Sequence, residues 1–350
     1  MTAATGPRSS GSAMVPAAET APLLEVEDLK VHYPVRRVTT QRLLRVPKRW
    51  VRAVDGLSFS LRRGEMLALV GESGCGKTTT AQAVIRMVEP TSGSIRLDGT
   101  DITRMSQAQM RPLRRKLQMI YQDPYEALDP RFRVRTTIEE PMLVHGIGAS
   151  RKDRFAGVLD ALDRAGLRPP DLYVDRYPHE LSGGQRQRVA IAASLALSPD
   201  LLLADEPVSM LDVSVRAGVL SLLDGLRRDL DMGILMITHD LSTAANFADR
   251  IAVIYLGRIV EEGPAGEVVG NPQHPYTRAL LSVVPKPDPR DRSAPQILRG
   301  ETPNPVEVPA GCRFHPRCPI AEESCRREDP RLRHPAAAAA ETHEAACLLL

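Results

Sequence analysis

The sequence predicts an α/β protein with a mixed sheet and flanking helices, and three observations support this. Short apolar runs at 66–70, 201–204 and 234–237 are typical of buried strands. Polar residues and then a helical pattern follow these runs, as in a parallel sheet covered by helices. The first run continues into a glycine-rich stretch, residues 71–78, at a strand-to-helix turn. That is the context in which phosphate-binding loops occur.

Residues 71–78 read Gly-Glu-Ser-Gly-Cys-Gly-Lys-Thr, the composition of a phosphate loop. Glycines allow backbone N–H groups to surround an anion, and the N-terminus of the next helix adds a positive dipole. Lys77 is placed to reach the β- and γ-phosphates, and the Thr78 hydroxyl to hold Mg²⁺. A chance glycine turn would explain the glycines, but not the strand, the spacing and the hydroxyl together. We expect nucleotide binding by Gly71, Ser73, Gly74, Cys75, Gly76, Lys77, Thr78 and Thr79.

Composition limits the class of protein. The 350 residues are 43% hydrophobic, enough for one large domain and a smaller appendage. No apolar run approaches the roughly 18 residues that span a bilayer, and the first twenty residues lack the apolar block of a signal peptide. A membrane role therefore requires a partner protein. A net charge of +3 and 4% aromatic residues do not favour nucleic-acid binding, and five cysteines, one in the phosphate loop, favour a reducing cytoplasm.

The N-terminal part contains two expected strands. Residues 1–22 are small and polar without periodicity and are expected to form a disordered leader. Strands are expected at about 24–34 and 51–61. Between them, the insertion at 36–52 carries only basic charges. Two interpretations of this insertion remain open: a solvated loop, or a contact with an acidic partner or anionic lipid headgroups.

The middle of the chain alternates strands with helices. A strand at 94–97 ends in the tight turn Asp98-Gly99, and a strand at 117–121 delivers Gln122. The pattern from 124 to 195 is mainly helical, as expected for an inserted lobe. Breaks in these helices are expected at Pro141, Gly146, Pro169, Pro170 and Pro178.

Three further motifs lie where ligands bind in α/β proteins. Residues 181–185 read Leu-Ser-Gly-Gly-Gln and open a helix, so this second glycine turn is another candidate anion site. The strand at 201–204 ends in Asp205-Glu206, and the strand at 234–237 is followed by His239. The carboxyl ends of parallel strands form the edge at which ligands bind.

These motifs follow one another in the order and spacing of an ATP-binding cassette (ABC), so residues 23–268 resemble a transporter ATPase subunit. The resemblance implies a P-loop ABC core at 23–270, with an antiparallel β lobe, a helical lobe at about 124–195, and a small C-terminal extension at 271–350. Gln122-Asp123-Pro124, the phrase at 274–281 and the cysteine-bearing tail resemble the oligopeptide/dipeptide importer branch. The basic insertion is similar to that of the second, F-type ATPase subunit of this branch.

The resemblance implies a catalytic and metal-binding role for five residues. Phosphoryl transfer requires positioned groups and neutralised charge more than covalent chemistry. By resemblance, Thr78, Gln122 and Asp205 serve Mg²⁺, and Gln122 also senses the membrane partner. Glu206 polarises the attacking water and His239 touches the γ-phosphate. The alternative for His239 is a hydrogen-bonded histidine of the core.

The resemblance also implies that the site needs a second subunit. Tyr33 would stack on adenine; the alternative is an ordinary core or edge aromatic, since a lone tyrosine is a weak signal. Ser182 and Gly184 would complete the ATP site of the opposite subunit, so that two cassettes clamp two nucleotides head to tail. The family commonly has Ser-Ala-Leu-Asp after the carboxylate pair, whereas this chain has Met210 in place of the alanine and retains Asp212.

The tail carries four cysteines: Cys312, Cys318, Cys325 and Cys347. In a cytoplasmic chain such a group favours metal ligands over disulfides. The spacings are wider than the paired Cys-x-x-Cys of most zinc sites. Some members of the peptide-importer branch resemble this arrangement and hold a 4Fe-4S cluster on four cysteines. A cluster, zinc and unliganded thiols all remain open, since thiol spacing does not determine the metal.

We therefore expect an ATP-hydrolysing subunit, with ATP and Mg²⁺, at the cytoplasmic face of a membrane importer of peptides. Expected partners are a second ATPase subunit, two permease subunits and an extracytoplasmic binding protein. One alternative is another solute, such as nickel or glutathione, because every catalytic residue would be shared. A second is a soluble cassette protein acting on ribosomes or DNA. Against it, the chain has one phosphate loop, and only about a hundred residues separate this loop from the 181–185 motif.

Overall fold

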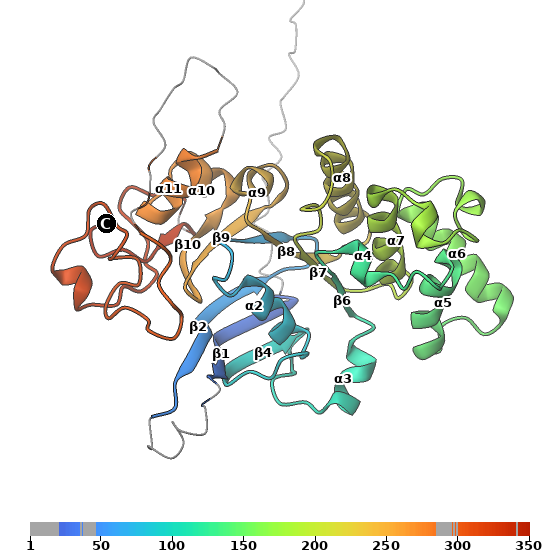
Figure 1. Cartoon of the computed structure of the whole chain (residues 1–350), viewed down its shortest axis with the longest axis horizontal. Helices are drawn as coiled ribbons and strands as arrows, with labels where there is room; N and C mark the ends of the chain where they lie inside the picture. Colours follow the sequence, from blue (N-terminus) through green and yellow to red (C-terminus); the bar gives the residue numbers. More distant parts are fainter. Residues whose placement is uncertain are drawn as a thin grey trace, which may run out of the picture.

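The centre of the molecule is a mixed sheet of seven strands in the order β11-β10-β9-β3-β8-β7-β6 (Figure 1). The five strands from β6 to β9 in this order run parallel, and β10 and β11 run antiparallel to their neighbours. The predicted mixed sheet is confirmed. The strands are β3 (Met66–Val70), β6 (Leu117–Ile120), β7 (Leu201–Asp205), β8 (Gly233–Thr238), β9 (Arg250–Tyr255), β10 (Arg258–Pro264) and β11 (Glu344–Ala345).

The computed structural model describes residues 21–35, 37, 47–284, 296, 298, 300–340 and 342–350. The first 20 residues of the predicted leader lie outside the described residues. So do residues 36 and 38–46 of the predicted basic insertion.

Alternate side chains of the central strands belong to two hydrophobic cores. Met66, Ala68 and Val70 of β3 pack into the core shared with the helical lobe. Leu67 and Leu69 pack into the core shared with the smaller sheet. Every residue of β3, β7 and β8 is buried. The uniformly apolar runs follow from this, since a strand covered on both faces has no solvent side.

A smaller antiparallel sheet, the β lobe, covers one face with helix α2 (Lys77–Val84) (Figure 1). Its order is β2-β1-β4-β5. The turn between β4 and β5 is the predicted Asp98-Gly99, and both residues have positive φ, 50° and 73°. Helix α3 (Gln107–Leu113) follows this sheet. The strands are β1 (Leu24–Pro34), β2 (Trp50–Leu61), β4 (Ser92–Leu97) and β5 (Thr100–Asp101).

The predicted helical lobe lies at the β6 side of the central sheet (Figure 1). One predicted break is wrong: Pro141 lies inside α5, which continues to Val144. Packing against α6 and α7 outweighs the local cost of the proline. No helix in the described ranges is both long and apolar enough to cross a bilayer. The lobe contains α4 (Pro124–Ala127), α5 (Val134–Val144), α6 (Arg151–Arg164), α7 (Gly183–Leu195) and the 3₁₀ turns η1 (Pro170–Leu172) and η2 (Pro178–Glu180).

The C-terminal extension packs against the other end of the central sheet (Figure 1). Strand β11 pairs with β10, and Phe314 is 1% exposed within the main core. The extension predicted from residue 271 onward therefore shares its sheet and its core with the cassette. Its elements are α11 (Pro275–Ser282), the 3₁₀ turn η3 (Ser324–Arg326) and β11. The helices α8 (Val213–Asp229), α9 (Leu241–Phe247) and α10 (Ala265–Gly270) precede it.

Candidate functional site

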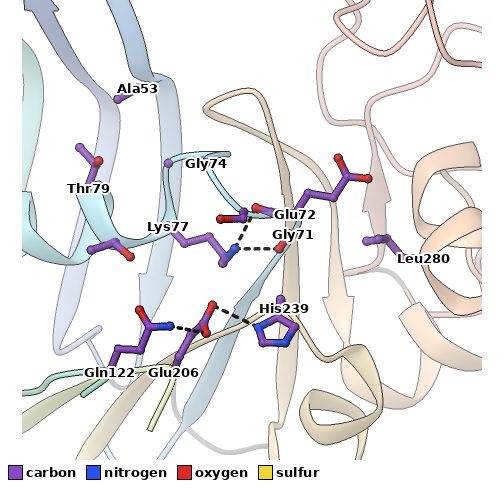
Figure 2. Close-up of a pocket in the computed structure, with 13 residues that line it drawn as sticks. Ala53, Gly71, Glu72, Gly74, Lys77, Thr79, Gln122, Glu206, His239 and Leu280 are labelled. Carbon is purple, nitrogen blue, oxygen red and sulfur yellow. Dashed lines mark hydrogen bonds and ion pairs between the residues drawn. The ribbon is translucent and has the colours of Figure 1, made fainter. Parts of the chain in front are cut away.

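The phosphate loop joins β3 to α2 and lines a cavity of 610 Å³ (Figure 2). Two of its glycines are required by close packing. A Cβ on Gly71 would lie 2.3 Å from the carbonyl oxygen of Ile254 on β9. A Cβ on Gly76, whose φ is +106°, would lie 2.2 Å from that of Ala53 on β2. The loop is thus seated directly on two strands. The predicted nucleotide residues that line the cavity are Gly71, Ser73, Gly74, Gly76, Lys77, Thr78 and Thr79.

Lys77 begins α2, and its ammonium lies inside the loop. Nζ donates to the carbonyl oxygens of Gly71 at 2.7 Å and Glu72 at 3.0 Å. These carbonyl groups carry no net negative charge to neutralise the ammonium, and the N–H groups at the start of α2 add to the positive potential. Cys75, also predicted to contact nucleotide, is 2% exposed, and burial raises the pKa of its thiol. The loop presents a cation and N–H donors, as a bound phosphate requires.

The three residues predicted to serve Mg²⁺ lie together. The Thr78 hydroxyl donates to Asp205 Oδ1 at 3.3 Å, and both residues line a neighbouring cavity of 530 Å³ with Gln122. Burial raises the pKa of Asp205, although the hydrogen bond from Thr78 opposes this rise. Hydroxyl, amide and carboxylate oxygens are ligands that Mg²⁺ accepts. These donors fit a magnesium ion bound next to the phosphate loop.

Glu206 follows β7 and lies between Gln122 and His239 (Figure 2). Its Oε2 accepts a hydrogen bond from Gln122 Nε2 at 3.0 Å, and its Oε1 lies 3.2 Å from His239 Nδ1. Its φ of +45° is rare for a residue with a side chain, and such strain is typical of functional sites. The His239 side chain is 60% exposed and lines the same cavity, so the alternative of a core histidine is wrong. Polar neighbours on both sides orient the Glu206 carboxylate.

The 181–185 motif lies apart from this cavity, at the start of α7 in the helical lobe. The Ser182 hydroxyl accepts a hydrogen bond from Gln185 N–H at 3.3 Å, and the Gln185 side chain accepts one from Ser182 N–H at 3.0 Å. This reciprocal capping fixes the turn. A Cβ on Gly184 would lie 2.4 Å from a methyl group of Val215, so Gly184 lies close against α8. Neither Ser182 nor Gly184 lines the 610 Å³ cavity.

Tyr33 lies near the end of β1, and the residue is 37% exposed. It pairs with Val51, two residues before Ala53, which lines the cavity. Tyr33 itself does not line the cavity. Its contact with adenine stays a prediction.

Sequence reasoning missed the part that α11 plays in the site. The backbone N–H of Glu72 donates to the Tyr276 hydroxyl at 3.0 Å, and Leu280 lines the cavity. Both belong to segment 274–281, from which the sequence indicated only a resemblance to the peptide-importer branch. Glu72 also lines the cavity, and no role was predicted for it. A tyrosine and a leucine at helical spacing after a proline start were the available signal.

Two of the four tail cysteines are joined by a backbone hydrogen bond, from Cys312 N–H to the carbonyl oxygen of Cys325 at 2.9 Å. Cys312 and Cys318 pack against the main core, and Cys325 and Cys347 are buried. All four are free thiols. Burial raises the pKa of Cys312 to about 11 and also raises those of Cys318 and Cys347. Within the described ranges, no three His, Cys, Asp or Glu side chains are arranged to hold a single metal ion.

Comparisons with protein families match two segments of the chain. The model of the ABC transporter family matches residues 54–209. The model of the oligopeptide/dipeptide transporter C-terminal region matches residues 260–325. The first segment contains the phosphate loop, the 181–185 motif and the carboxylate pair, and the second contains the 274–281 phrase and three of the four tail cysteines.

Curated proteins and solved structures extend this similarity. A putative peptide import ATP-binding protein of Brucella ovis is 45% identical, over 89% of this chain and 94% of its own length. The oligopeptide transport ATP-binding protein AppF of Bacillus subtilis is 43% identical, over 93% of this chain and 97% of its own length. A dimeric ATP-binding cassette in a post-hydrolysis state, bound to ADP and Pi, is 26% identical with a TM-score of 0.60. That match covers 69% of this chain and 98% of that structure.

Proposed function

The chain belongs to the ABC transporter family of ATP-hydrolysing subunits, and on this premise we propose that it drives a membrane importer of dipeptides or oligopeptides. The observation that carries the proposal is the similarity to peptide import subunits over almost the whole chain, extension included. The extension matters because the catalytic motifs are common to cassettes for many solutes.

The geometry supports ATP hydrolysis in which each residue has a distinct task. Lys77 and the start of α2 bind and neutralise the phosphates. Thr78, Asp205 and Gln122 would hold Mg²⁺, which neutralises further phosphate charge when bound. Glu206 is the general base that orients and polarises the attacking water.

His239 and Gln122 hold the Glu206 carboxylate from its two sides, so they position the base. We also assign His239 a contact with the γ-phosphate, because its exposed ring lines the cavity beside Glu206. The hydrogen bond from Gln122 to Glu206 would link binding of Mg²⁺ by Gln122 to activation of water by Glu206.

The separation of the 181–185 motif from the phosphate loop supports a two-subunit machine. Ser182 and Gly184 are fixed at the start of a helix but do not line the chain's own nucleotide cavity. We propose that they complete the cavity of a second ATPase subunit, in a head-to-tail pair, by offering N–H groups to its γ-phosphate. The dimeric cassette bound to ADP and Pi, at 26% identity, is consistent with this assembly. A different second ATPase subunit is the arrangement that we favour, as in the F-type resemblance.

We place the permease contact beside Gln122. Tyr121 and Met87 are 44% and 56% exposed and touch each other, with the Tyr121 hydroxyl 3.4 Å from the Met87 sulfur. Tyr121 and Gln122 line the 530 Å³ cavity between α2 and the helical lobe. A permease segment bound there would touch the residue that contacts Glu206, so docking and hydrolysis would be coupled. The chain would thereby lie at the cytoplasmic face of the membrane, with an extracytoplasmic binding protein delivering peptide.

For the tail we propose a 4Fe-4S cluster on Cys312, Cys318, Cys325 and Cys347. The support is the number and spacing of the tail cysteines, together with the hydrogen bond that joins the backbones of Cys312 and Cys325. Among the described residues no group of three or more His, Cys, Asp or Glu side chains is arranged to hold a metal ion. The preference for a cluster over zinc rests on the cysteine spacings, which are wider than those of most zinc sites. A cluster is compatible with such thiols because each would bind a different iron. ATP hydrolysis has no redox step, so the cluster would not transfer electrons. Its role would be to link the tail segments together.

The test of the proposed function is purification of the tagged chain with its permease and binding protein, followed by reconstitution in vesicles. We expect uptake of dipeptides or oligopeptides that requires ATP. Uptake of nickel or glutathione but not of peptides would contradict the substrate class. Co-purification with ribosomes or DNA in place of permease subunits would contradict the importer itself.

A further inference from the structure

The tail of the chain reaches the phosphate loop through Arg317. Its Nη1 donates to Glu72 Oε2 at 2.9 Å and its Nη2 to Glu72 Oε1 at 3.1 Å, a bidentate ion pair. The Thr302 hydroxyl donates to the same carboxylate at 2.6 Å. The Arg317 side chain is only 9% exposed. Bidentate, largely buried pairs of this kind are the strong ones, and here the partners are 245 residues apart.

Segment 312–318, which carries this arginine, is fixed at two further points. Arg313 forms an ion pair with Asp55 on β2, and both side chains are buried. Phe314 packs against the rings of Tyr255 and Tyr276, with centroids 5.2 and 5.4 Å away. Such aromatic contacts and buried pairs restrict a loop to one arrangement. The backbone that carries Arg317 is therefore held in place by its neighbours Arg313 and Phe314.

Glu72 is placed where an uncompensated charge would oppose ATP binding. It lines the nucleotide cavity, and its carbonyl oxygen accepts a hydrogen bond from Lys77. Its carboxylate points away from the Lys77 ammonium (Figure 2). Burial acts to raise the pKa of Glu72, but hydrogen bonds from Arg317 and Thr302 keep it below its ordinary value. The carboxylate is therefore charged at neutral pH, and an unpaired negative charge here would repel the phosphates.

We propose that Arg317 is a positioning residue of the nucleotide site, which holds Glu72 away from the ATP phosphates and so couples segment 312–318 to nucleotide affinity. The inference rests on the proposed ATP site and adds the tail to it. Coupling of this kind is reciprocal: the tail strengthens ATP binding, and bound ATP stabilises the tail. Because Cys312 and Cys318 bound the segment, ligation or modification of these thiols would alter ATP affinity.

The test is the dissociation constant of a non-hydrolysable ATP analogue with Mg²⁺, measured by titration calorimetry on the full chain. Arg317→Ala should raise this constant about three- to thirtyfold. Glu72→Gln in the same chain should restore most of the affinity, because it removes the charge that Arg317 compensates. Arg317→Lys, which keeps the charge but not the bidentate geometry, should give an intermediate constant. The control is Arg327→Ala, whose side chain is 76% exposed and forms an ion pair with Glu323.

A second readout follows the tail itself. Hydrogen exchange of residues 311–319 should slow when the analogue binds to the wild-type chain, and should not change in the Arg317→Ala, Glu72→Gln double variant. Thermal denaturation of each variant identifies any that fails to fold, in which case Arg317→Lys alone supplies the comparison.

Three outcomes would overturn the inference. If Arg317→Ala and Arg317→Lys bind the analogue as tightly as the wild type, Arg317 does not position the site. If the loss in Arg317→Ala is not rescued by Glu72→Gln, the tail acts only on folding. If the wild-type chain does not bind the analogue at all, the proposed function fails and this inference fails with it.

Discussion

Replacement of Glu206 by glutamine tests the assignment of the group that activates water. The change keeps the shape of the side chain but removes the charge that attracts a proton. Loss of a general base typically lowers turnover about 10²- to 10⁴-fold, which corresponds to roughly 3–5 kcal/mol of activation free energy. We expect at least about 10³-fold here, because the other carboxylate among the described lining residues, Glu72, is paired with Arg317.

ATP binding should survive this substitution, because the phosphate loop and Lys77 are untouched. Phosphate release by the reconstituted complex measures turnover, and calorimetry with ATP and Mg²⁺ measures affinity. Lys77→Ala should show the opposite pattern, with weakened binding. The matched control is Glu322→Gln, an exposed carboxylate of the tail, which should leave both quantities unchanged. Hydrolysis by the Glu206→Gln complex at close to the wild-type rate would refute the role of Glu206.

Three other predictions concern assembly, the tail and pH. Ser182→Arg should spare analogue binding by the isolated chain but abolish ATP-driven dimerisation, seen by light scattering, because its cation would fill the partner's γ-phosphate site; normal dimerisation would contradict this. Anaerobically purified protein should be brown, with about four irons per chain, and Cys318→Ser should bleach it; colourless, iron-free protein made with cluster-assembly machinery present would exclude the cluster. Burial lowers the pKa of His274 from 6.5 to about 4, so the unfolded chain binds a proton that the folded chain does not. The free energy of unfolding should therefore fall by up to about 3 kcal/mol as the pH drops from 6.5 to about 4. Urea titrations at several pH values should show a weaker pH dependence of this free energy in His274→Asn than in the wild type. An equal pH dependence in both proteins would contradict the assignment to His274.

The parts of the fold that could be predicted from sequence are those with local causes. The run 66–70 is apolar throughout because β3 is covered on both faces, and the glycines of the phosphate loop mark the turn that follows it. The turn at Asp98-Gly99 was predictable because both residues tolerate positive φ. Local rules also misled at Pro141. They predicted a break there, whereas the tertiary packing of α5 retains the helix.

Contacts between distant segments could not be predicted in this way. The approach of Arg317 to Glu72 depends on how the tail packs against the β10 end of the central sheet, and neither residue carries a local signal for it. Tyr276 is similar: its sequence phrase indicated a family, but its hydrogen bond to the phosphate loop became visible only with α11 in place. The carboxylate of Glu206 and the amide of Gln122 were both expected at the site, and the structure adds that they bond to each other.

The most direct test of the central claim is ATP hydrolysis by the complete transporter, reconstituted in vesicles, with and without peptide on its binding protein. We expect peptide-loaded binding protein to accelerate hydrolysis, and peptide to accumulate on the side of the vesicle membrane to which the permease delivers it. Glu206→Gln in this chain should abolish both effects. Hydrolysis that is indifferent to peptide, with no peptide accumulation, would contradict the claim that this chain powers peptide import.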